Sequence, residues 1–319
     1  MPVAIEARGL VKRYGEFAAV DGLSVAVDEG EVLGFLGPNG AGKTTSIRML
    51  AGLTRPSAGE VWIQGKRVDG DGRARRGLVG LCPQNLVVWE HLTCTENLLF
   101  LADMYAVRRR ESVKSARALI ERLHLDERAD ILAGKLSGGM KRRLNLALAL
   151  IHDPPIIVLD EPSAGLDPQS RIVVHDFIQD LGATQGKTVI LTTHEMDVAD
   201  RLSKRVAIID RGKLRVIDSP ERLKNTVGEG DTVVLRLKDA GRAEEAARAA
   251  AAVEGVRGAV AVSREVRFQS LNAVARLREV YGALEKLGIE VEDASMRKNT
   301  LEDVFIQLTG RALREEAVQ

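Results

Sequence analysis

The nine-residue stretch GPNGAGKTT, residues 37–45, constrains this chain more than any other part of its sequence. It fits the pattern G-x-x-x-x-G-K-[ST], with Gly37, Gly42, Lys43 and Thr44 at the four fixed positions. The apolar run VLGFL precedes it and apolar residues at helical spacing follow it, which predicts a strand, a glycine turn and a helix. Such a turn directs backbone N–H groups at a phosphate chain. We therefore expect a nucleotide site in which Lys43 reaches the β- and γ-phosphates and the Thr44 hydroxyl binds Mg²⁺.

The composition is that of an ordinary globular protein with two domains. The chain has 319 residues, of which 45% are hydrophobic and 29% are charged. Its formal net charge of +1 gives no support to binding of nucleic acid or of an acidic membrane surface. Two isolated cysteines, Cys82 and Cys94, are too few for a disulfide framework and favour a reducing, cytosolic setting. We expect neither a signal peptide nor a transmembrane helix, because charge or glycine interrupts every apolar run within about ten residues.

A second buried strand, in the sequence IIVLDEP, ends in the adjacent carboxylates Asp160 and Glu161. Neighbouring side chains on a strand point to opposite faces, so these two carboxylates diverge. One can hold a metal ion through water while the other polarises an attacking water. A cluster of acids at a helix N-terminus is the alternative interpretation. The phosphate-binding pattern elsewhere in the chain favours catalysis.

Four further positions carry weaker signals, and each also has an ordinary structural explanation. Tyr14 is predicted in a loop upstream of the phosphate site, where a half-buried strand aromatic is the simpler interpretation. Gln84 and His194 each follow a buried strand, at the edge where open α/β sheets bind ligands, but both also suit a solvated loop. The sequence LSGGM places residues 137–139 at a helix start, where an anion site and an ordinary N-cap look alike.

The C-terminal part of the chain has a different pattern, beginning after a glycine-rich linker at residues 227–231. It predicts a β-α-β-β-α-β-α order that resembles a ferredoxin-like arrangement, and it contains no phosphate or metal motif. Its last helix is predicted to begin at a cap formed by Thr300 with Asp303. We therefore expect one domain over residues 1–225, with a helical subdomain at about 88–152, and a second domain over residues 226–319.

These motifs, taken together and in this order, resemble those of the nucleotide-binding subunit of an ATP-binding cassette (ABC) transporter. The resemblance covers roughly residues 3–225. The stretch RKNTLEDVFIQLTG is similar to the tail of one subset, the single-cassette ATPases of drug-resistance-type (ABC-2) exporters. The fold that this resemblance implies is α/β. It is a P-loop NTPase cassette with a mixed sheet core, an antiparallel β subdomain and an α-helical subdomain, joined to a small α+β C-terminal domain.

The resemblance also implies a set of site residues. Those implied to bind ATP are Tyr14, Gly37, Pro38, Asn39, Gly40, Ala41, Gly42, Lys43, Thr44, Thr45, Ser137, Gly138, Gly139 and Asp167. Those implied to act in catalysis are Glu161, His194, Gln84 and Lys43, and those implied to hold Mg²⁺ are Thr44, Gln84 and Asp160.

Each of these residues has a role under the resemblance. Tyr14 would stack on adenine, and Asp160 would hold Mg²⁺ through water. Glu161 would be the general base, and His194 would hold the γ-phosphate and position the water. Gln84 would sense Mg²⁺ and the γ-phosphate and would link the site to a membrane partner.

The signature LSGGM implies a partner cassette. Ser137 and Gly139 would bind the γ-phosphate of ATP held by a second copy, and Asp167 would communicate between the two sites. The chain carries one cassette, so the expected assembly is a homodimer with twofold symmetry. One departure from the family pattern is Met140, which stands where the family usually has Gln.

The function that the resemblance implies is ATP hydrolysis that powers export of a drug, lipid or similar substrate. The substrate would pass through a separate transmembrane permease, with this chain bound at the cytoplasmic face of the cell membrane. A soluble ABC ATPase of nucleic-acid repair or translation is one alternative, disfavoured by the near-neutral charge and by the single cassette. An importer ATPase with a regulatory C-terminal domain is the other.

Overall fold

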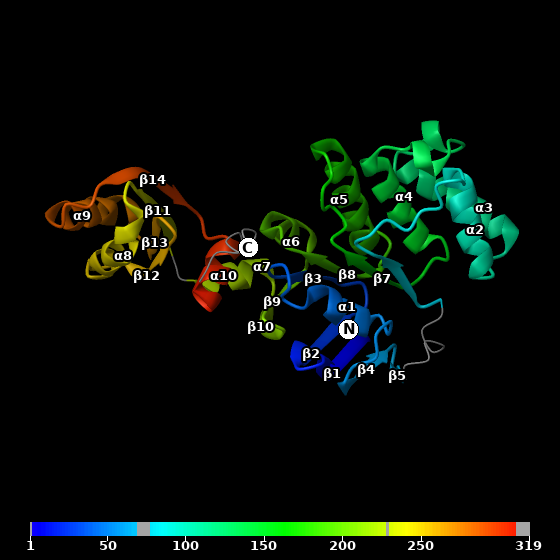
Figure 1. The fold of residues 1–319 in the computed structure, drawn as a ribbon, viewed down its shortest axis with the longest axis horizontal. Helices are drawn as coiled ribbons and strands as arrows, with labels where there is room; N and C mark the ends of the chain where they lie inside the picture. The colour runs from blue at the N-terminus through cyan, green and yellow to red at the C-terminus, as the bar shows by residue number, and fades with distance from the viewer. Residues whose placement is uncertain (1, 69–76, 228–229, 311–319) are drawn as a thin grey trace. The chain divides into compact units, whose positions relative to one another are not determined.

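The computed structural model describes residues 2–68, 77–227 and 230–310 (Figure 1). The chain divides into two compact units, Met1–Ile217 and Asp218–Gln319. The sequence predicts the end of the first domain at residue 225, somewhat later than this division. The difference lies in helix α7 (Pro220–Thr226), which packs against α10 (Leu301–Thr309) and so belongs to the second unit. Part of the predicted linker, residues 228–229, lies outside the described residues.

A six-stranded sheet in the order β10-β9-β3-β8-β7-β6 forms the centre of the first unit. Its strands are β3 (Val32–Leu36), β6 (Val79–Cys82), β7 (Ile156–Asp160), β8 (Thr188–Thr193), β9 (Arg205–Asp210) and β10 (Lys213–Asp218). Strand β3 is parallel to β8 and β9, and β7 is parallel to β6 and β8. Every residue of β3, β7 and β8 is buried, as expected for parallel strands covered on both faces. The carboxyl ends of these strands therefore meet at one edge of the sheet.

A second, four-stranded sheet in the order β2-β1-β4-β5 belongs to the same unit. It consists of β1 (Val3–Tyr14), β2 (Phe17–Asp28), β4 (Ala58–Ile63) and β5 (Lys66–Arg67), all paired antiparallel. Strands β1 and β2 run as one long hairpin with several register shifts, which are bulges inside continuous strands.

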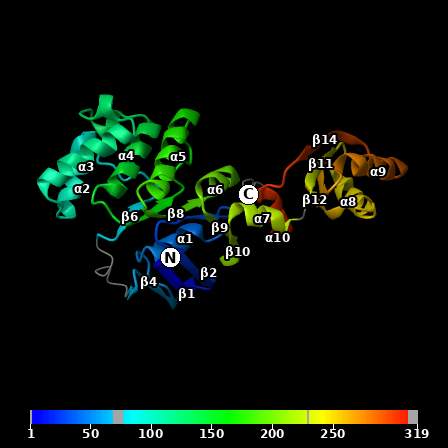
Figure 2. The ribbon, with the colours of Figure 1, turned by 180° about the vertical axis from the view of Figure 1, so that it is seen from behind.

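The helices of the first unit form two groups (Figures 1 and 2). Helices α2 (Cys94–Met104), α3 (Arg109–Arg122) and α4 (Gly138–Leu150) pack on one another. Helices α1 (Lys43–Leu50), α5 (Pro168–Ala183) and α6 (Met196–Leu202) contact the six-stranded sheet. Short 3₁₀ turns lie at Asp126–Arg128 (η2) and Ala133–Lys135 (η3) in this unit, and at Ala240–Arg242 (η4) in the second unit. Across the described ranges, no helix has both the length and the apolar character needed to cross a bilayer.

The second unit has the ferredoxin-like topology that the sequence predicts. Its elements are β11 (Asp231–Leu237), α8 (Ala243–Ala251), β12 (Arg257–Val262), β13 (Glu265–Ser270), α9 (Ala273–Lys286) and β14 (Val291–Arg297), followed by α10. The strands pair antiparallel in the order β12-β13-β11-β14. Thr300 and Asp303 form the predicted capping box at the start of α10. The α/β fold of the first unit and the α+β fold of the second are thereby confirmed.

Candidate functional site

An open pocket of about 650 Å³ lies where β3, β7 and β8 end at their carboxyl edge. It is lined by Tyr14, Phe17, Ala19, Asn39, Gly40, Gly42, Lys43, Thr44, Thr45, Gln84, Glu161 and His194. All of these except Phe17 and Ala19 are predicted site residues. Segments from five different parts of the sequence therefore converge on one cavity beside the glycine-rich loop.

The glycine-rich loop leaves no space for side chains at two of its fixed positions. Gly42 is the N-cap of α1 and has φ 98°, in the left-handed region. A Cβ atom at Gly42 would lie 2.3 Å from the carbonyl oxygen of Ala19, and one at Gly37 would lie 2.2 Å from that of Ile209. The backbone can wrap this closely only because both residues are glycine.

Lys43 is held under this loop by backbone oxygens. Its Nζ atom donates to the carbonyls of Gly37 and Pro38, at 2.8 and 3.0 Å, and lies 3.7 Å from Oε1 of Glu161. Burial lowers the pKa of the Lys43 ammonium, and the carboxylates of Glu161 and Asp160 act in the opposite direction. The arrangement fixes one positive charge at the floor of the pocket, where a phosphate chain would meet it.

Asp160 is the centre of a buried hydroxyl network. Its Oδ1 atom accepts hydrogen bonds from the Thr44 hydroxyl at 3.0 Å and from the Thr192 hydroxyl at 2.7 Å. Thr44 and Asp160 thus bring two oxygen atoms that can coordinate a metal ion together beside the phosphate loop. Mg²⁺ is bound by one or two such oxygens together with water and substrate phosphate oxygens, so this donor set fits Mg²⁺.

Glu161 and His194 form a pair that lines the same pocket. The Nδ1 atom of His194 lies 3.0 and 3.1 Å from the two carboxylate oxygens of Glu161. Glu161 itself has φ 48°, and its N–H donates to the Thr192 hydroxyl at 2.9 Å. A carboxylate with fixed direction, beside a histidine and within reach of Lys43, has the geometry of a general base for an attacking water.

Two exposed aromatic rings flank the mouth of the pocket. Tyr14 is 56% exposed and Phe17 is 64% exposed, and both lie at the tip of the β1–β2 hairpin. Tyr14 is the last residue of strand β1 and not part of a loop, and about half of its surface is exposed at the pocket, so its position allows the stacking role as well as that of a half-buried strand aromatic. Phe17 was missed in the sequence, although its place three residues beyond Tyr14 at the predicted turn could have indicated it. Exposed rings beside a phosphate site are suited to stacking on a nucleobase.

The predicted signature residues lie elsewhere in the chain. Ser137 is the N-cap of α4, and its hydroxyl accepts from the N–H of Met140 at 3.3 Å. Asp167 is the N-cap of α5 and accepts from the N–H of Ser170 at 2.9 Å; hydrogen bonds from Ser170 lower the pKa of this carboxyl. A Cβ atom at Gly139 would lie 2.4 Å from the Ser170 hydroxyl, so the two helix starts pack closely. None of these signature residues is among the described residues that line the P-loop pocket.

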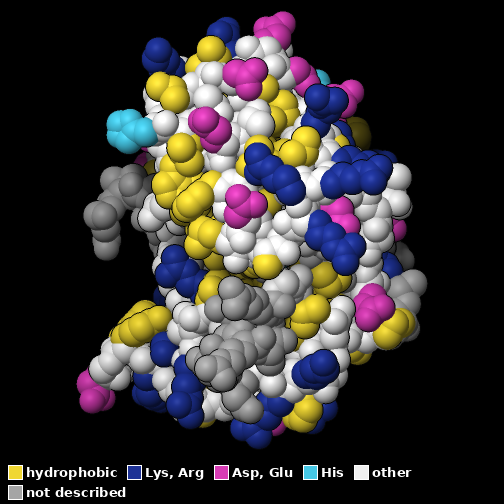
Figure 3. All heavy atoms as spheres, turned by 90° about the vertical axis from the view of Figure 1, so that its right-hand side faces the viewer, with side chains coloured by type: hydrophobic (Ala, Val, Ile, Leu, Met, Phe, Trp, Pro, Cys, Tyr) yellow, Lys and Arg dark blue, Asp and Glu magenta, His cyan; other side chains and the backbone are white. Residues whose placement is uncertain are grey.

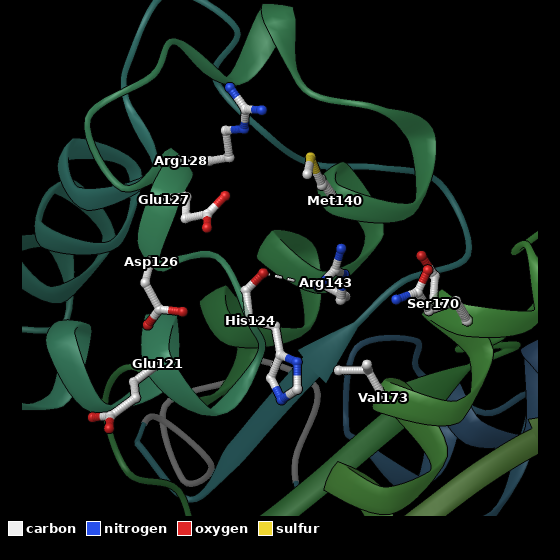
Figure 4. Close-up of a pocket in the computed structure, with 10 residues that line it drawn as sticks. Glu121, His124, Asp126, Glu127, Arg128, Met140, Arg143, Ser170 and Val173 are labelled. Atoms are coloured by element: carbon white, nitrogen blue, oxygen red, sulfur yellow. Dashed lines mark hydrogen bonds between the residues drawn. The ribbon is translucent and has the colours of Figure 1, made fainter.

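Met140 faces a second pocket of about 550 Å³ (Figure 4). Arg143 lines the same pocket and donates to the backbone carbonyls of Leu123 and His124, at 2.9 and 3.0 Å. The Met140 side chain is partly buried and packs against the main hydrophobic core of the first unit. The methionine at this position therefore has a packing role within its own chain.

Two buried residues of the site were missed in the sequence. Thr192 connects Asp160 with the backbone of Glu161, and Arg142 donates to the carbonyls of Asp160 and Pro162 on either side of Glu161. A hydroxyl at the end of the strand KTVILTT was the available signal for Thr192. No sequence pattern distinguishes Arg142 from the two basic residues that flank it.

The fold and the pocket define a P-loop nucleotide hydrolase. The family model described as ABC transporter matches residues 20–164. The chain is 39% identical to the daunorubicin resistance ATP-binding protein DrrA2 of Streptomyces coeruleorubidus, over 96% of this chain and 95% of that protein. It is 37% identical to the Nod factor export ATP-binding protein I of Burkholderia lata, over 99% of this chain and 100% of that one.

A solved dimeric ATP-binding cassette in a post-hydrolysis state, bound to ADP and Pi, is also similar. Its TM-score is 0.61 at 26% identity, covering 67% of this chain and 98% of that one. The chain therefore belongs to the ABC transporter family. Within that family it belongs with the ATP-hydrolysing subunits of ABC-2 type exporters.

Proposed function

We propose that two copies of this chain sandwich two ATP molecules, each held by the P-loop of one copy and the signature of the other. The observation that carries this proposal is the separation of the two motifs. The P-loop pocket gathers Lys43, Glu161 and His194, whereas Ser137 and Gly139 stand at the start of α4 outside it. Ser137 and Gly138 are exposed, so the N-terminus of α4 is accessible to an anion from another molecule. Asp167, beside Gly139, would transmit closure from one site to the other.

Within each site, Lys43 and the loop N–H groups would bind the phosphates and Tyr14 would stack on adenine. Mg²⁺ held by Thr44, Asp160 and Gln84 would neutralise charge on the β- and γ-phosphates. Glu161 would accept the proton of the attacking water, and His194, paired with Glu161 at 3.0 Å, would hold the γ-phosphate and orient that water. Catalysis of this kind rests on positioning and on charge stabilisation.

We further propose that the dimer works at the cytoplasmic face of the membrane, bound to a separate permease. Exposed apolar side chains support this contact: Leu86 and Val87 follow Gln84 closely, and Phe100 and Met104 lie on α2. The side of the first unit that carries α2 and α3 shows hydrophobic groups interspersed with basic and acidic ones (Figure 3). A permease segment bound there would sense the Gln84 loop. The exported compound would be a drug, a lipid or a similar molecule; two relatives are named for daunorubicin resistance and for Nod factor export.

The test is Glu161→Gln in the full-length chain. It should lower Mg-ATP hydrolysis by at least about 100-fold, because the general base is lost, and should leave an ATP-dependent dimer on size-exclusion chromatography. Glu60→Gln is the matched control, because Glu60 pairs with exposed Arg67 on a different sheet. Normal hydrolysis by Glu161→Gln would refute the role of this residue, and a monomer at saturating ATP would refute the sandwich.

A further inference from the structure

Three consecutive basic residues near the start of α4 reach three different places. Lys141 pairs with the exposed Glu90 at 2.7 Å. Arg143 donates to the backbone carbonyls of Leu123 and His124, directly after α3. Arg142 is buried as Arg143 is, at 5% exposure, but its guanidinium donates to the loops that follow β6 and β7. The sequence KRR gives no sign of this difference.

The Arg142 guanidinium donates to backbone carbonyl oxygens of two loops at once. Its acceptors are Pro83 at 3.0 Å, Gln84 at 2.6 Å, Asp160 at 2.9 Å, Pro162 at 3.0 Å, and Glu161. A planar guanidinium carries five N–H groups in a fixed fork, so it can serve several carbonyls from one position. The two loops it joins are the one that follows β6 and the one that follows β7.

The loop after β7 contains Glu161 in a strained backbone conformation. Glu161 has φ 48°, in the left-handed region that a non-glycine residue adopts at a cost, which its surroundings must offset. The Glu161 N–H is held by Thr192, and its carbonyl and those of its two neighbours are held by Arg142. The direction of the Glu161 carboxylate toward Lys43 and His194 therefore depends on this guanidinium.

The loop after β6 is held by the same face of α4. Arg142 holds the carbonyl of Gln84, and Asn145, less than one turn further along, donates to the carbonyl of Pro83 at 3.3 Å. The amide oxygen of Asn145 also accepts from the N–H of Val87 at 3.0 Å. Helix α4 thus fixes the Gln84 loop on both sides of Gln84.

We propose that Arg142 is a positioning residue for hydrolysis, which fixes Glu161 and Gln84 relative to each other and to the helix that begins at Ser137. A shift of the α4 N-terminus when ATP contacts Ser137 would carry both loops with it. The presence of ATP at the signature would thereby be coupled to the orientation of the general base. This inference rests on the proposed ATP sandwich for the event that moves α4, but the positioning of Glu161 stands on contacts within one chain.

The experiment compares Arg142→Gln and Arg142→Lys with the matched control Arg143→Gln in the full-length protein. Misplacing a catalytic group by about 1 Å costs roughly 100-fold in rate, so Arg142→Gln should lower kcat by that factor. The KM for Mg-ATP and the affinity for a fluorescent ATP analogue should change less than about threefold, since the P-loop contacts remain. Arg142→Lys should recover only part of kcat, because an ammonium cannot replace the fork. Arg143→Gln should lower the melting temperature while kcat per folded protein stays near wild type.

Three results would overturn the proposal. The first is a wild-type kcat in folded Arg142→Gln, and the second is an equal loss of kcat in Arg143→Gln. The third is full rescue by Arg142→Lys, which would show that any buried cation suffices. The kcat of Arg142→Lys also decides the question if Arg142→Gln does not fold.

A separate measurement distinguishes this proposal from the ATP sandwich. It compares the ATP-dependent dimerisation of Glu161→Gln with that of the double variant Glu161→Gln and Arg142→Lys. Loss of the dimer in Glu161→Gln alone refutes the sandwich and leaves the kcat comparison valid.

Discussion

The substitution Thr192→Val removes one hydroxyl from β8 and keeps the shape of the side chain. This hydroxyl has no exposed surface, and it connects Oδ1 of Asp160 with the N–H of Glu161. An unsatisfied buried donor at Glu161 costs about 1–3 kcal/mol, and a lost hydrogen bond to a carboxylate costs about 1.5–3 kcal/mol. Asp160 keeps the Thr44 hydroxyl at 3.0 Å, so we expect the free energy of unfolding to fall by about 3–4 kcal/mol.

The same strand offers a matched control. Thr188 lies four residues earlier on the same face of β8, at its other end, and is also buried. Its hydroxyl accepts from the N–H of Gly30 at 3.0 Å. Thr188→Val should therefore lower the free energy of unfolding by about 1–2 kcal/mol and leave kcat unchanged. Thr192→Val should also lower kcat by about 10- to 100-fold, since it releases the backbone of Glu161.

Urea unfolding followed by tryptophan fluorescence is the assay for stability. The chain has two tryptophans, Trp62 and Trp89, and both lie in the first unit, so their signal reports that unit. Steady-state Mg-ATP hydrolysis gives kcat for each variant. The reasoning fails if Thr192→Val unfolds and hydrolyses like wild type, or if Thr188→Val loses as much activity.

Three further predictions concern the pocket and its surroundings. Gly42→Ala should weaken equilibrium ATP binding at least tenfold, because its Cβ would lie 2.3 Å from the Ala19 carbonyl; unchanged affinity contradicts this. Burial lowers the Lys43 pKa below its ordinary 10.5, and phosphate prefers the charged form, so the ATP affinity of the wild type should fall as pH rises in the alkaline range. Lys43→Arg should abolish that pH dependence, which nucleotide titrations at several pH values measure. Burial raises the pKa of the Cys82 and Cys94 thiols to about 11, so neither should react with a thiol reagent at pH 8 until urea unfolds the chain.

The residues that line the P-loop pocket could be predicted from the sequence because each comes after a buried strand, Lys43 by way of the glycine loop. Runs such as VLGFL and IIVLDEP mark parallel strands, and parallel strands end at one edge, so Lys43, Asp160, Glu161 and His194 had to lie close together. Their polar character at the end of apolar runs made them conspicuous. The ferredoxin-like order of the second unit was predictable for a similar reason, since its strands alternate and its helices are amphipathic.

The residues that hold the site in place could not be predicted. Arg142 resembles any other polar residue at a helix start, and its role depends on two loops that come from distant parts of the sequence. Thr192 is a common residue in strands, and its hydroxyl matters only because Asp160 lies on the next strand. The position of α7 likewise depends on α10, which follows it far along the chain. Side chains whose function is to hold other residues leave no periodic pattern.

The exposed aromatic pair at the hairpin tip has a consequence for the choice of nucleotide substrate. Tyr14 and Phe17 offer ring faces to a base, whereas hydrogen bonds to base edges are what distinguish one purine from another. The phosphate end of the pocket, with Lys43 and its glycine loop, is the same for every nucleoside triphosphate. We therefore expect the protein to hydrolyse GTP as well as ATP. The concentration of nucleoside triphosphate, more than the identity of its base, would then set the rate of hydrolysis.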